Sequence, residues 1–135
     1  MSSAARFPPD LGDDLEAVLG AIRRAPDSTS AGISEASGLP LGRVRATLAA
    51  LEAAGIAVRR NDWQGQGKGY LQRWSFRGPG RIELWAPEHD GRRRRLYQDR
   101  AEAIEASARS QGPGARASAI VFVVAADGSV IGGQG

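Results

Sequence analysis

TSAGISEASGLPLGRVRATLAALEAAG, residues 29–55, decides how this chain folds. Thr29 or Ser30 is a favourable cap for the start of a helix, because a hydroxyl oxygen can accept a hydrogen bond from a free backbone amide. Gly38 supplies a sharp turn, and Pro40 then suits the first turn of a second helix, where its missing N–H costs nothing. The stretch predicts two short helices joined by a tight turn.

Apolar residues recur at helical spacing in both predicted helices. In the first, Ile33 and Ala36 are expected to be buried, and Leu39 fills the core behind the turn. One face of the second helix collects four larger apolar residues, Leu41, Val44, Leu48 and Leu51. Gly55 then ends this helix in a left-handed conformation.

The sequence also predicts a helix before this stretch and a hairpin after it. The helix starts near Asp13 or Asp14, whose carboxylates suit the positive helix end. Its apolar stripe is formed by Leu15, Val18, Leu19 and Ile22. The residues before it, 1–12, form a flexible arm, and the hairpin runs from Ile56 to about Phe76 through a glycine-rich loop.

Residues 13–77 resemble the winged helix-turn-helix domains of bacterial transcription regulators. The turn glycine, the valine and leucine spacing and the terminal LEAAGI fall in the order of that family. The resemblance implies that the helix containing Val44 lies in the major groove of double-stranded DNA and that the hairpin is a wing on the DNA backbone.

Eight residues are the candidate DNA contacts under this interpretation. Arg43 and Arg45 flank the outward face of the second short helix, and Thr47 lies near the Arg43 edge. The other five are Ser30 and, in the wing, Arg59, Arg60, Lys68 and Arg73. Because neither Arg43 nor Arg45 lies on the buried stripe, replacing both with alanine is expected to leave thermal stability nearly unchanged.

Glycine and alanine occupy the centre of that outward face, which counts against strong sequence reading, since base edges are read by longer polar side chains. The predicted function is sequence-specific or semi-specific DNA binding by a small transcription regulator. A protein-interaction adaptor with the winged fold but without DNA is one alternative. A plasmid or phage accessory factor that binds DNA for replication or transfer is another.

Beyond a Gly-Pro-Gly linker at 78–80, residues 81–135 predict a small ββαββ module. Strands are expected over Arg81–Ala86, Arg92–Tyr97, Ala119–Ala125 and Ser129–Ile131, with a helix capped by Asp99 that buries Ala101, Ile104 and Ala108. The element order resembles small bacterial modules, and this implies no activity. The predicted fold class is therefore α+β, with a winged helix-turn-helix followed by a ββαββ module for dimerisation or sensing.

The run Ile120–Val124 puts apolar side chains on both faces of its strand, whereas one helix can cover a single face. The uncovered face should meet the winged domain or a second copy of the chain. We expect a homodimer, because DNA sites are commonly read as paired half-sites.

Composition limits the classes of function. The chain has 135 residues, a net charge of +3 and no cysteine, and its single histidine, His89, falls in a predicted turn. These features predict no enzyme, no metal site and no cofactor. Arg92–Arg95 alternates between strand faces, which favours a solvated sheet edge over a nucleic-acid patch. With no secretory signal and no apolar run of membrane-spanning length, we expect a cytoplasmic protein.

Overall fold

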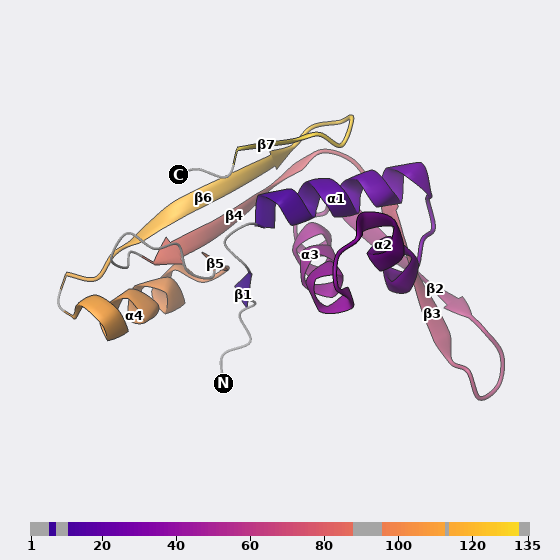
Figure 1. Cartoon of the computed structure of the whole chain (residues 1–135), viewed down its shortest axis with the longest axis horizontal. Coiled ribbons are helices and arrows are strands. Elements are labelled where there is room, and N and C mark those ends of the chain that lie inside the picture. The colour runs from indigo at the N-terminus through magenta and orange to yellow at the C-terminus, as the bar shows by residue number, and fades with distance from the viewer. Residues whose placement is uncertain (1–5, 8–10, 88–95, 113, 133–135) are drawn as a thin grey trace.

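The computed structural model describes residues 6–7, 11–87, 96–112 and 114–132. Three packed helices and a β-hairpin are followed by an antiparallel sheet with one further helix, so the fold is α+β as predicted. Figure 1 shows the hairpin and the last helix at opposite ends of the molecule.

The three packed helices are α1 (Leu11–Arg24), α2 (Ser30–Ser37) and α3 (Leu41–Ala53). Thr29 caps α2 as predicted, since its hydroxyl accepts a hydrogen bond from the Gly32 N–H at 3.1 Å. Gly38 ends α2 at a φ of 76° and Gly55 follows α3 at a φ of 74°, both in the left-handed region that favours glycine. The turn between α2 and α3 is therefore the one that the sequence predicts.

Two predicted core positions are wrong. Ala36 is exposed, and Ile33 is the residue that α2 buries. Leu41 is also exposed, because the first residue of α3 borders an open hollow and not the packed helix interface. Helices α2 and α3 therefore bury fewer residues than their apolar pattern predicts.

The expectation of a flexible arm over residues 1–12 is wrong where the structure describes it. Helix α1 begins at Leu11, before the predicted Asp13 or Asp14, and Leu11 is completely buried. A short strand, β1 (Arg6–Phe7), pairs antiparallel with β5 (Leu96–Tyr97). Residues 6–7 therefore form an edge strand of the larger sheet.

Strands β2 (Ala57–Trp63) and β3 (Tyr70–Phe76) form the hairpin as a separate two-stranded sheet. The two strands pair in register from Ala57 with Phe76 to Trp63 with Tyr70, within the hairpin bounds that the sequence predicts. Trp74 is buried, and its backbone N–H donates to the Ser28 carbonyl oxygen at 2.8 Å. This bond ties the hairpin to the loop between α1 and α2.

The larger sheet has the strand order β1-β5-β4-β6-β7. Its remaining strands are β4 (Gly80–Pro87), β6 (Ala117–Val124) and β7 (Val130–Gly132), and α4 (Arg100–Gln111) packs on it. The order β4-β5-α4-β6-β7 along the chain is the predicted ββαββ arrangement. At the predicted turn between β6 and β7, hydrogen bonds from Ser129 lower the pKa of the Asp127 carboxyl.

Helix α4 is capped by Asp99 as predicted but buries a different face. Ala103 and Ser107 are buried, whereas Ala101 and Ala108 are exposed. Because small residues occur all around α4, its sequence does not define one apolar stripe, and contact with the sheet decides which face is covered. The predicted turn at 89–91 and the tract Arg92–Arg95 lie outside the described residues.

The inner face of the sheet shares one hydrophobic core with the three helices. Ile120, Phe122 and Val124 of β6 are buried in the same cluster as the apolar residues of α1 and α3. Figure 1 shows α1 running beside β4 and β6. The three-helix unit therefore packs on the face of β6 that carries Ile120, Phe122 and Val124. On the outer face Val123 and Ile131 are exposed, and homodimerisation stays a prediction.

Gly80 marks a close approach between the sheet and the helical unit. A Cβ atom at this position would lie 2.6 Å from Ile56 Cγ1 and 3.3 Å from the Ala54 carbonyl oxygen. We expect Gly80→Ala to lower the free energy of unfolding by about 1–3 kcal/mol, because overpacking forces neighbouring groups to shift. Gly78→Ala is the matched control, since nothing lies within 4 Å of its Cβ position. Equal urea midpoints for the two variants would contradict the close approach.

Candidate nucleic-acid interface

The predicted contact residues of α3 divide into buried and exposed groups. Thr47 is completely buried, and its hydroxyl donates to the Arg43 carbonyl oxygen at 2.8 Å. The expectation that Thr47 reaches DNA is therefore wrong, because its side chain is turned into the helix packing. Arg45 is exposed and has no ion pair within the described part of the chain. Of these two residues, only Arg45 can reach a ligand on the surface.

Arg43 is held by a carboxylate of α1. Its Nη2 atom lies 2.6 Å from Asp14 Oδ1 and its Nε atom lies 3.0 Å from Asp14 Oδ2. The Asp14 side chain is only 2% exposed, whereas that of Arg43 is 39% exposed. The sequence predicts Asp14 at a helix start. In the structure it is the buried carboxylate of a bidentate ion pair between α1 and α3.

This ion pair corrects the expectation that Arg43 can be removed without loss of stability. Arg43→Ala should lower the free energy of unfolding by about 1–3 kcal/mol, because it leaves a buried acceptor without this partner. Arg45→Ala on the same helix should change it by less than about 0.5 kcal/mol. Urea unfolding of the two single variants measures both values, and an Arg43→Ala protein as stable as the Arg45→Ala protein would contradict a structural role for the pair.

Three of the four predicted wing cations are also paired within the chain. Arg59 Nε lies 2.9 Å from Glu52 Oε2 of α3, and Arg73 Nε lies 2.9 Å from Asp62 Oδ2 across the hairpin. Arg60 Nη2 approaches Asp27 Oδ1 at a longer distance of 3.7 Å. These pairs reduce the positive charge that the arginines present to solvent.

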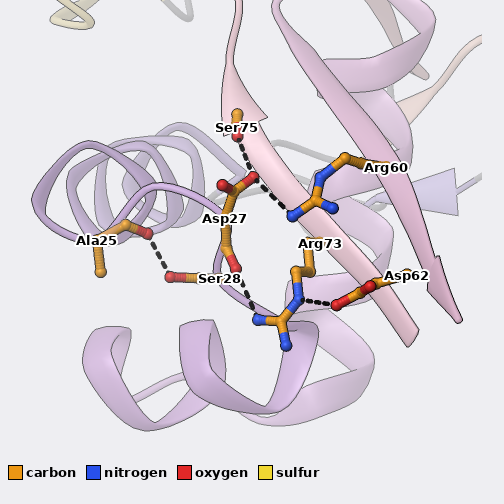
Figure 2. Close-up of polar contacts among 7 residues, drawn as sticks. All are labelled: Ala25, Asp27, Ser28, Arg60, Asp62, Arg73 and Ser75. Atoms are coloured by element: carbon orange, nitrogen blue, oxygen red, sulfur yellow. Dashed lines mark hydrogen bonds and ion pairs between the residues drawn. The ribbon is translucent and has the colours of Figure 1, made fainter. Parts of the chain in front are cut away.

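Asp27, in the loop between α1 and α2, connects that loop to the hairpin. Figure 2 shows its carboxylate facing Arg60 and Ser75, while its carbonyl oxygen accepts from Arg73 at 3.2 Å. In the same loop the Ser28 hydroxyl donates to the Ala25 carbonyl. The sequence pattern did not identify Asp27 as a functional residue. Its position between Pro26 and a Ser/Thr run marks a turn but gives no sign of a contact with residues far along the chain.

Lys68 occupies the tip of the hairpin. Its side chain is exposed and has no ion pair among the described residues. The flanking glycines at 65, 67 and 69 all have positive φ values, as a tight turn in this conformation requires. Lys68 is thus the cation of the hairpin tip that remains available to a ligand.

Two aromatic side chains lie beside that tip on one face of the hairpin. Trp63 and Tyr70 are register partners, and their ring centroids are 4.9 Å apart at an interplanar angle of 58°. Trp63 is 57% exposed and Tyr70 is 65% exposed. Both rings are therefore accessible at the surface, whereas Trp74, farther along the same strand face as Tyr70, is buried.

Two adjoining hollows separate α3 from β3. The outer hollow, of about 300 Å³, is bordered by Leu41 and Tyr70, and the inner hollow, of about 260 Å³, extends to Trp74. Ser30, Arg45 and Gln72 border both hollows. Ser30, a predicted contact residue, is half-buried here at the start of α2. Ser30 and Arg45 therefore border the same hollows, whereas Arg43 and Thr47 border neither.

Other kinds of site receive no support from the described residues. Within residues 6–7, 11–87, 96–112 and 114–132, no three His, Cys, Asp or Glu side chains are grouped as metal ligands. In the same ranges, no helix has the length and apolar character needed to cross a bilayer. His89 lies outside the described residues.

Comparison of the chain with protein-family models, curated proteins and solved structures finds no significant match. The three helices and hairpin are consistent with a winged helix, but no family is identified by these comparisons. Functional assignment therefore depends on the surface formed by α3 and the hairpin.

Proposed function

We propose that this chain binds double-stranded DNA, in a sequence-specific or semi-specific way, as a small bacterial transcription regulator. The observation that carries the proposal is the combination of an exposed Arg45 on α3 with an exposed Lys68 at the hairpin tip, neither of which has an ion pair among the described residues. One cation lies on a helix that follows a tight turn, and the other on a projecting hairpin. This is the distribution expected for a helix in the major groove and a wing on the backbone.

Local charge supports the proposal. Residues 57–76, which form the hairpin, contain four basic residues and one acidic residue, so the hairpin has a net charge of +3, as large as that of the whole chain. Arg59, Arg60 and Arg73 contribute to this field even though each has an internal acidic partner. A concentrated positive field attracts the phosphate backbone before any close contact forms.

Arg45 and Lys68 have different proposed roles in binding DNA. Arg45 is placed to contact a base edge or phosphate from α3, and Lys68 to contact a phosphate from the hairpin tip. The exposed residues around Arg45 include Gly42 and Ala49, which offer little hydrogen bonding to base edges. We therefore propose that sequence reading is limited and that backbone contacts supply most of the affinity.

Substitution of these two cations tests the proposal. The double variant Arg45→Ala, Lys68→Ala should bind duplex DNA at least about 10-fold more weakly, and its plot of log affinity against log salt should be shallower by about 1 for each phosphate that the protein no longer neutralises. Arg109→Ala is the control, because this exposed arginine lies on α4, far from the hairpin. Fluorescence anisotropy over a salt series gives both quantities. Equal affinity of the double variant and the control would contradict the proposal.

A protein-interaction adaptor is the second candidate. It is favoured by the internal pairing of Arg43, Arg59 and Arg73, which reduces the cations free for phosphate, and by the exposed Trp63 and Tyr70. The salt series separates the two functions, since binding of an adaptor to duplex DNA would be absent at every salt concentration.

The same proposal includes homodimerisation, a cytoplasmic location and the absence of catalysis. Val123 and Ile131 are register partners with exposed side chains on the outer face of the sheet, and they suit contact with a second copy. Sedimentation equilibrium of the full chain, alone and on a DNA duplex, measures the oligomeric state in both conditions.

A further inference from the structure

We propose that the hairpin and the outer hollow bind an unpaired base, so that the preferred DNA is a duplex that carries a single-stranded tail. This inference rests on the proposed binding of duplex DNA and names a more specific substrate for the same surface. It comes from the aromatic pair and the hollow beside it, which duplex binding alone leaves unexplained.

The aromatic pair has the character of a stacking surface. More than half of each ring-bearing residue, Trp63 and Tyr70, is exposed, although two adjacent aromatic side chains would gain stability from burial. Paired bases within a duplex present their edges, whereas an unpaired base presents its flat face. Aromatic side chains bind such faces with little dependence on sequence, because every base has a π-face.

The outer hollow adds groups that complement a base and its phosphate. Tyr70 forms an aromatic border, and Leu41 and Leu71 add apolar surface. Ser30 and Gln72 also border the hollow, and within the described chain neither side chain has a hydrogen-bond partner. The volume of about 300 Å³ lies at the lower end of clefts that hold small molecules.

Charge favours a nucleic-acid occupant over an apolar protein segment. Arg45 borders the hollow with no ion pair to another described residue, and Lys68 lies in the loop that leads directly to Tyr70. The acidic residue that borders the inner hollow, Glu52, pairs with Arg59, and Asp62 lies on the opposite face of the hairpin, where it pairs with Arg73. An anionic chain with exposed bases matches both the available cations and the exposed rings.

The test compares one labelled DNA duplex with blunt ends and the same duplex with a single-stranded tail. We expect the full-length protein to bind the tailed duplex about 10-fold more tightly, in line with the usual effect of base–aromatic stacking. The double variant Trp63→Ala, Tyr70→Ala should lose this preference and keep its affinity for the blunt duplex. Tyr70→Phe retains the ring and should keep the preference. Circular dichroism checks that each variant is folded.

A spectroscopic signature accompanies the binding measurement. Stacking of a base on exposed Trp63 should quench tryptophan fluorescence when the tailed duplex is added, and the blunt duplex should quench it less. Trp63→Phe keeps an aromatic ring at this position but removes the reporter, so the difference between the two duplexes should disappear. Trp74, which is only 5% exposed, and Trp85, which is half-buried on β4, remain as internal references.

Each outcome separates this inference from the proposed function. Equal binding of tailed and blunt duplexes by the unsubstituted protein overturns the inference and leaves duplex binding intact. A double variant that loses affinity for both duplexes equally also overturns it, because the rings then act as a general backbone contact. No binding to either duplex overturns the proposed function itself. If the rings instead mediate self-association in sedimentation and give no tail preference, they are a protein contact.

Discussion

Helix α1 must be buried on more than one side, and the rest of the molecule depends on this constraint. It contacts α2, α3, β3 and β7, so its side chains fill the space both between the helices and beneath the sheet. Leu15 and Val18 lie in the same cluster as Phe122 of β6, and the hairpin joins this unit through the bond between Trp74 and Ser28. The position of α3 relative to the hairpin, and therefore the whole candidate interface, follows from how these elements pack around α1.

Internal ion pairs decide how much of the basic composition is available for binding. Asp14 takes Arg43 into the packing of α1 against α3, and Asp27 draws two arginines of the hairpin toward the loop that precedes α2. These contacts fix the hairpin in place, and they also neutralise charge that a count of arginines assigns to DNA. The cations that stay available lie on α3 and at the hairpin tip. Their placement therefore matters more for binding than the total charge of the chain.

Local signals predicted most of the secondary structure correctly. Gly38 and Gly55 marked the ends of helices because both adopt backbone conformations that other residues rarely accept, and the Thr29 and Asp99 caps acted within a few residues of themselves. Predictions of burial failed in helices whose different faces carry residues of similar size or similar apolar character. Ala101 and Ala108 in α4 are exposed, and Leu41 in α3 borders a hollow, because alanine-rich helices do not specify which side meets a neighbour.

The sequence was sufficient to predict the order of elements, the turn between α2 and α3, the position of the hairpin and the placement of Arg45 and Lys68 at the surface. Packing of the helices and strands was needed to show that Thr47 is buried, that Arg43 pairs with Asp14, and that Tyr70 forms an exposed pair with Trp63. The two groups of features differ in how far apart along the chain the interacting residues lie. Caps, turns and periodicity involve neighbours within a few residues, whereas an ion pair between α1 and α3 or a hollow between α3 and β3 exists only after packing brings distant segments together.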